Sequence, residues 1–153
     1  MENLLVGKRL INQRHILSDL IYAKDLEKNP TIIAMEFKYK EDVSYMFEYL
    51  GTSYEFQDEA IFTNFMQWFG DLGKHLGFNM IKMKEVFYLI EQELLEFLDQ
   101  SNLDMLDVFR KGCVVYEDSY NDLFIEEIED DIFLNYLVNM KSNLAEKYVM
   151  DYM

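Results

Sequence analysis

The chain has 153 residues, half of them hydrophobic, and a formal net charge of −15. This length and composition predict one folded domain over residues 1–153 and argue against a disordered chain. The acidic balance argues against nucleic acid as a partner, because phosphate neutralisation needs clustered Lys and Arg.

The first part of the chain has the spacing of a long amphipathic helix. Hydrophobic residues three and four apart predict a helix over residues 3–26. The residues expected on its inward face are Leu10, Leu17, Leu20 and Ile21.

A helix start is expected at Asn29 and Pro30, with Asn as the N-cap and Pro in the first helical position. A short helix is predicted from there to about residue 39. Another is predicted over residues 42–50, ending at Gly51.

Residues 58–99 carry the strongest helical pattern, two amphipathic helices joined by a tight turn. Gly77 is expected to end the first of them in a left-handed conformation. The inward faces are rich in aromatic, Leu and Met side chains, which suit either a packed core or the wall of an apolar cavity. The sequence leaves both interpretations open.

Beyond residue 100 the pattern predicts two further helices. Ser101 is expected to cap a long helix whose inward face includes Cys113, Tyr116 and Phe124. The acidic run at residues 125–131 then marks a boundary before a last helix. With few Pro and Gly residues and almost no alternating pattern, the fold class predicted is all-α, a bundle of six to eight helices.

No motif of catalysis occurs in the chain: there is no nucleophile elbow, phosphate-binding loop or credible triad. We therefore expect a protein that is not an enzyme and has no catalytic residues and no metal site. Glu91, Glu93 and Glu96 are interpreted as a solvated helix face, and Cys113 as a small buried hydrophobic residue. The chain lacks both a run of about 18 apolar residues and a signal-peptide pattern, which predicts a cytoplasmic protein without membrane insertion.

Two histidines leave alternatives open. His15 lies on a predicted helix, where an exposed histidine suits phosphotransfer or an ordinary surface role. His75, in the last turn of an aromatic helix, suits a haem ligand, which would make the chain a haem sensor. It equally suits a cation that stabilises the helix C-terminus through the dipole.

The chain resembles a family of haem-less, globin-like sensor domains. The resemblance lies in VSYMFEYLGTSYEFQDEAIFTNFMQWFGDLGKHLGFNM followed by KEVFYLIEQELLEFLD, which match an F-x-x-[FY]-x-x-W-[FL] pattern and a G-[FI] turn between long helices. The pattern is filled here by Phe62, Phe65, Trp68, Phe69, Gly77 and Phe78. Without a kinase module, the chain is most similar to small Bacillus sporulation inhibitors that mimic a kinase sensor domain.

This resemblance implies a globin-like fold, a homodimer, no cofactor, and a fatty-acid-like ligand in place of haem. It also implies a function in signal transduction, namely competition with a sporulation histidine kinase for the signal that this two-component system senses. The expected ligand-binding residues are Phe62, Phe65, Met66, Phe69, Phe87, Ile90 and Leu94. Arg14, His15 and His75 are the candidates for the carboxylate or anion end.

A different class of function remains open beside the ligand sensor. In this alternative the chain is an acidic decoy that inhibits a basic protein surface without a small ligand. Glu126, Glu127 and Glu129 would then carry the binding.

Overall fold

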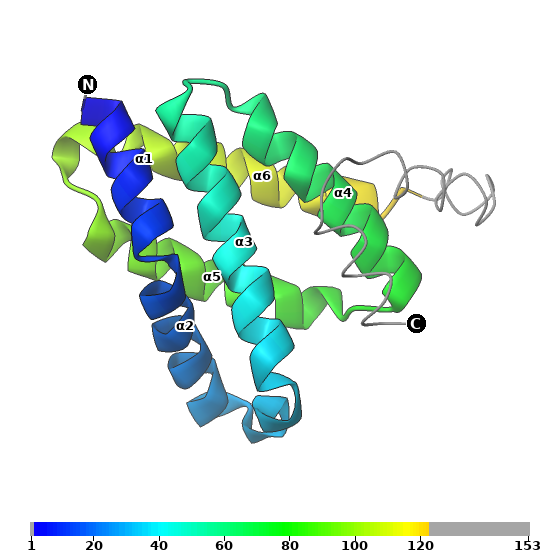
Figure 1. Cartoon of the computed structure of the whole chain (residues 1–153). Helices are drawn as coiled ribbons and strands as arrows, with labels where there is room; N and C mark the ends of the chain where they lie inside the picture. Colours follow the sequence, from blue (N-terminus) through cyan, green and yellow to red (C-terminus); the bar gives the residue numbers. More distant parts are fainter. Residues whose placement is uncertain (1, 123–153) are drawn as a thin grey trace.

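The computed structural model describes residues 2–122, and this part of the chain is all-α, as predicted. Its α-helices are α1 (Glu2–Asn12), α2 (Arg14–Lys28), α3 (Glu36–Glu55), α4 (Ala60–Leu76), α5 (Met80–Phe97) and α6 (Asp104–Tyr120), and its 3₁₀ helices are η1 (Pro30–Met35) and η2 (Gln100–Asn102). Figure 1 shows α1 to α4 in front, with α5 and α6 crossing behind them. Phe124, the acidic run and the predicted last helix lie outside the described residues. None of the described helices is long and apolar enough to cross a membrane.

The predicted first helix is divided at Gln13 into α1 and α2. Gln13 has φ −100° and ψ 8°, and the guanidinium of Arg14 donates to the carbonyl oxygen of Ile11 at 2.8 Å. A side chain that enters the backbone ladder is a known cause of a helix kink. Leu10, Leu17 and Ile21 are buried as expected, but the prediction for Leu20 is wrong, because the change of direction leaves it 45% exposed.

The helix α3 continues through Gly51, so the prediction that a helix ends there is wrong. Within α3, this glycine lies against Gly7 of α1. A Cβ atom on Gly7 would lie 2.5 Å from the carbonyl oxygen of Gly51, and one on Gly51 would lie 2.7 Å from that of Gly7. Gly51 therefore serves the close approach of two helix backbones.

The central helix pair is confirmed as α4 and α5, joined at Gly77. Gly77 has φ +75° and ends α4 as predicted. The amide of Phe78 donates to the Gly73 carbonyl at 2.8 Å, which satisfies an end carbonyl of the helix. The side chain of Asn79 then caps α5 by accepting from the Lys82 amide at 3.0 Å.

The start of α6 differs from the prediction that Ser101 caps it. Ser101 lies in η2, where its amide donates to the Asp99 carboxylate at 3.2 Å, and α6 begins at Asp104. A Cβ atom on Gly70 of α4 would lie 2.5 Å from the carbonyl oxygen of Tyr116, so the backbones of α4 and α6 also touch.

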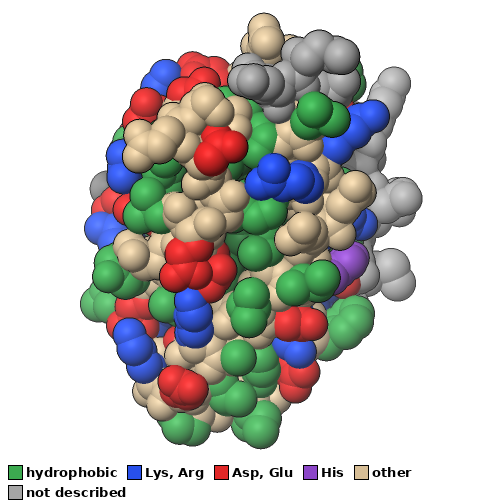
Figure 2. Space-filling model, turned by 90° about the vertical axis from the view of Figure 1, so that its left-hand side faces the viewer, with side chains coloured by type: hydrophobic (Ala, Val, Ile, Leu, Met, Phe, Trp, Pro, Cys, Tyr) green, Lys and Arg blue, Asp and Glu red, His purple; other side chains and the backbone are tan. Residues whose placement is uncertain are grey.

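An ion pair between Lys24 and Glu93 links α2 to α5 where the two helices cross. Glu93 is buried, so the interpretation of a solvated face is wrong for this residue. Glu91 accepts from Arg110 at 2.8 Å. Figure 2 shows acidic and basic side chains interspersed with hydrophobic ones over one face of the molecule.

The contact between Gly7 and Gly51 predicts the effect of adding a methyl group there. Gly7→Ala and Gly51→Ala should each lower the free energy of unfolding by about 1–3 kcal/mol, because the new Cβ overpacks against backbone that cannot rotate away. Chemical denaturation measures this change. The control is Gly77→Asn, because nothing lies within 4 Å of a Cβ there and Asn tolerates a left-handed conformation. Equal stability of Gly7→Ala and the wild type would contradict the close crossing.

Candidate functional site

A pocket with mainly apolar walls lies between η1, the adjoining ends of α2 and α3, and the turn between α4 and α5. It has a volume of about 360 Å³, within the range of about 300–1,000 Å³ typical of small-molecule sites. Its apolar walls come from Ile32, Met35, Tyr39, Phe78, Met83 and Val86. We call it the η1 pocket.

The η1 pocket also has charged groups of both signs. Its carboxylates belong to Asp25, Asp42 and Glu85, and its ammonium groups to Lys38 and Lys82. Asp25 and Asp42 are buried, whereas Glu85 and Lys82 are exposed. The negative charge is therefore partly interior, and the positive charge of Lys82 is at the surface.

Asp25 is held by two neutral donors. The side-chain amide of Asn29 donates to its Oδ1 at 2.6 Å, and the hydroxyl of Tyr39 donates to its Oδ2 at 2.7 Å. Burial, and then this hydrogen bond, raise the pKa of Tyr39 well above its usual value, so the hydroxyl remains a donor at neutral pH. Pro30 begins η1 as predicted, but Asn29 makes no side-chain cap and bonds to Asp25 instead.

Lys82 owes its position to the cap of α5. The hydrogen bond from its amide to Asn79 places it in the first turn of this helix, beside the pocket. Among the described residues it has no ion-pair partner, whereas Lys38 lies 3.3 Å from Glu41. Lys82 is thus available to an anionic group.

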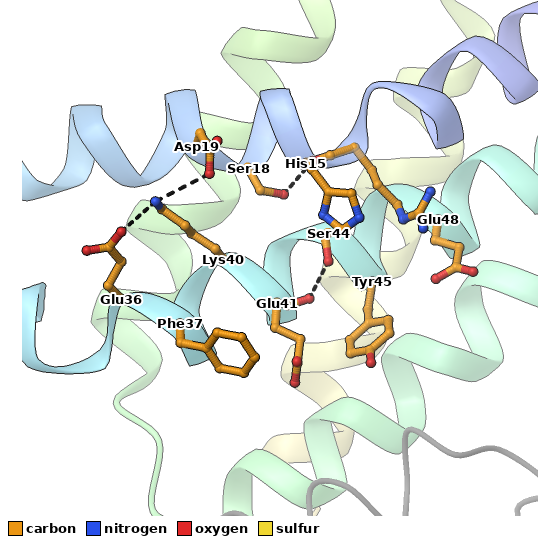
Figure 3. Close-up of a pocket in the computed structure, with 11 residues that line it drawn as sticks. His15, Ser18, Asp19, Glu36, Phe37, Lys40, Glu41, Ser44, Tyr45 and Glu48 are labelled. Carbon is orange, nitrogen blue, oxygen red and sulfur yellow. Dashed lines mark hydrogen bonds and ion pairs between the residues drawn. The ribbon is translucent and has the colours of Figure 1, made fainter.

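A second hollow of about 720 Å³ lies between α2 and α3, and it includes Arg14 and His15. Most of its lining residues are polar or charged, and Phe37 and Tyr45 are the bulky apolar rings among them. Figure 3 shows Lys40 between Asp19 and Glu36, with which it pairs at 3.3 and 2.6 Å. This groove brings together two of the three predicted anion-binding residues but offers little apolar wall for an alkyl chain.

His75, the third of them, lines neither hollow. It lies in the last turn of α4, where its Nδ1 is 3.0 Å from the backbone oxygen of Asp71. A histidine here suits the helix C-terminus, where positive charge is favoured.

The seven residues predicted to bind ligand all lie in the hydrophobic core. Phe69 and Phe87 contact the ring of Tyr116 at centroid distances of 5.4 and 5.2 Å, and Phe65 stacks on Tyr49 at 4.3 Å. None of the seven lines the η1 pocket or the groove between α2 and α3. The seven residues are Phe62, Phe65, Met66, Phe69, Phe87, Ile90 and Leu94. Their ligand-binding role stays a prediction.

Metal and thiol chemistry have little support in the described part of the chain. Within it, no three His, Cys, Asp or Glu residues lie close enough together to hold a metal ion. Cys113 is partly buried against the core, and burial raises the pKa of its thiol, which keeps it protonated and weakly nucleophilic.

The sequence analysis missed the η1 pocket because its residues come from separate elements. Asp25, Lys38 and Lys82 are ordinary helix charges in the sequence, and only the packing of α2, α3 and α5 brings them together. The Asn29–Pro30 pair and the cap at Asn79 were the detectable signals, since each marks a chain turn that borders the pocket.

No family model matches the chain, and neither a curated protein nor a solved structure matches it. The resemblance to globin-like sensor domains therefore stays a prediction.

Asp71 of α4 gives a pH-dependent prediction. It is buried and accepts a hydrogen bond from Ser119; burial raises its pKa, and Asp122 adds to this effect. The native state therefore binds this proton more tightly than the unfolded state, and the contribution of Asp71 to stability falls as pH rises above about 3.8. Asp71→Asn, which keeps an acceptor for Ser119, should gain stability relative to the wild type over this rise and then level off.

The measurement is the free energy of unfolding of both proteins between about pH 3 and 7. Asp118→Asn, on the exposed side of α6, is the matched control and should show a smaller change. A loss of stability of Asp71→Asn relative to the wild type as pH rises would contradict the raised pKa of Asp71.

Proposed function

We propose that the chain is a non-enzymatic regulatory protein that binds a small amphipathic signal in the η1 pocket. The observation that carries the proposal is the combination of six apolar wall residues with the ammonium group of Lys82, which has no ion-pair partner within residues 2–122. An alkyl chain gains free energy by leaving water for such walls, and a carboxylate at the edge pairs with the lysine.

The regulated process in this proposal comes from the resemblance in sequence. The protein competes with the sensor domain of a sporulation histidine kinase for a fatty-acid-like signal and so inhibits sporulation. Competition of this kind needs a binding site and a partner domain of similar specificity, and it needs no catalytic group. The homodimer implied by the resemblance is part of the same proposal.

The site in the proposal differs from the one predicted from the sequence. The η1 pocket replaces the interior of the central helix pair, because the core side chains there contact one another. Lys82 replaces Arg14, His15 and His75 at the anionic end, since it alone of these four residues lines the η1 pocket.

Octanoate is the probe that tests this proposal, because it is short enough to remain monomeric. We expect saturable binding at one site, and Lys82→Glu should weaken it about fivefold, the effect of losing an exposed ion pair of about 1 kcal/mol. Isothermal titration calorimetry measures both affinities. Lys8→Glu, the same charge change at an exposed residue of α1, should leave the affinity unchanged.

Two results would overturn the proposal. One is the absence of saturable octanoate binding to the wild type. The other is an equal loss of affinity in Lys82→Glu and Lys8→Glu, which would mean that only the net charge matters.

A further inference from the structure

The inner part of the η1 pocket holds a buried carboxylate, that of Asp25. Asp25 is 5% exposed, and no Lys, Arg or His among the described residues forms an ion pair with it. Its two hydrogen-bond donors, Asn29 and Tyr39, are both neutral. Each carboxylate oxygen has a further lone pair, so Asp25 retains both charge and acceptor capacity.

Two of the nearby lysines are engaged elsewhere, and a third, Lys28, is exposed at the neighbouring hollow and forms no ion pair with Asp25. Lys24, next to Asp25 in α2, pairs with Glu93 of α5. Lys40 pairs with Asp19 and Glu36. A buried charge without a counter-ion is costly, and removal of that cost favours the binding of a cation.

Asp25 can be reached from two hollows. It lines the η1 pocket and also a neighbouring hollow of about 370 Å³ between the end of α2 and α5. Asn29 and Glu85 line both hollows as well, so the two are adjacent. A ligand group next to Asp25 therefore has open space on two sides.

The charges of the η1 pocket differ from its interior to its surface. Asp25 and Asp42 are buried, and the half-buried Lys38 already pairs with Glu41, whereas Lys82 and Glu85 are exposed. The apolar walls come from Ile32, Phe78 and Met83 among others. The methyl end of a plain fatty acid would cover Asp25 without neutralising it. A molecule with a positive group inside and a negative group outside suits this arrangement better.

We propose that the η1 pocket recognises an aliphatic molecule with a primary ammonium group, which binds Asp25, and a carboxylate, which pairs with Lys82. This inference rests on the proposed function and narrows its ligand from a fatty-acid-like molecule to an amino-carboxylate one. The three N–H groups of the ammonium supply charged donors to the Asp25 oxygens, and the ring of Tyr39 offers an aromatic wall.

The test compares octanoate, octylamine and 8-aminooctanoate by calorimetry at about 0.15 M salt, where long-range attraction to this acidic protein is screened. The wild type should bind 8-aminooctanoate about tenfold more tightly than octanoate, the gain expected from a charged hydrogen bond in a buried site. Asp25→Asn should remove this preference. Glu27→Gln, the same charge change two residues away on the exposed side of α2, should retain it.

A second variant separates charge recognition from a structural role of Asp25. Tyr39→Phe removes one hydrogen bond to Asp25 and leaves its carboxylate, so the preference for 8-aminooctanoate over octanoate should persist. Loss of the preference in Tyr39→Phe as in Asp25→Asn would overturn the inference, because Asp25 would then act only through Tyr39. Octylamine should likewise lose affinity in Asp25→Asn. An equal loss of octylamine affinity in Glu27→Gln would mean that only the net charge attracts it, and this would overturn the inference.

The remaining outcomes distinguish this inference from the proposed function. Equal binding of octanoate and 8-aminooctanoate to the wild type would overturn the role of Asp25 and leave the η1 pocket as a carboxylate site. No saturable binding of any of the three probes would overturn both.

Discussion

Backbone contact between crossing helices, made at glycine, is the constraint on which the rest of the structure depends. Gly7 and Gly51 bring α1 against α3, and Gly70 brings α4 against α6. At each crossing a Cβ atom would lie within 2.7 Å of a carbonyl oxygen of the facing helix. Because interiors are close-packed, such crossings fix the helices relative to one another and leave little freedom for the core around Trp68 and Tyr116.

The η1 pocket follows from this arrangement. The chain must pass from the end of α2 to the start of α3, and Pro30 begins the tight 3₁₀ turn that makes this connection. The turn between α4 and α5 lies opposite η1. Gly77 ends α4 at this turn, and Asn79 caps α5. Loops positioned by a rigid scaffold are common sites of binding. The packed core thus holds two chain turns close together, and the hollow between them combines apolar walls with Asp25 and Lys82.

Much of the fold could be predicted from periodicity, but the site could not. The spacing of Phe62, Phe65 and Phe69 identified the buried face of α4, and Gly77 marked its end, because both signals are local. Gly51 was misjudged because a glycine that admits a neighbouring helix has the same local sequence signal as one that ends a helix. Asp25 gave no signal, since its burial depends on residues of η1 and α5 that are distant in the chain.

NMR of methionine methyl groups distinguishes a ligand in the η1 pocket from a ligand in the core. Met35 and Met83 line the pocket, whereas Met46, Met66 and Met105 are buried in the core. On titration with 8-aminooctanoate, the signals of Met35 and Met83 should shift with saturation while those of the core methionines stay in place. Shifts confined to Met66 and its core neighbours would contradict the account and favour a ligand between α4 and α5.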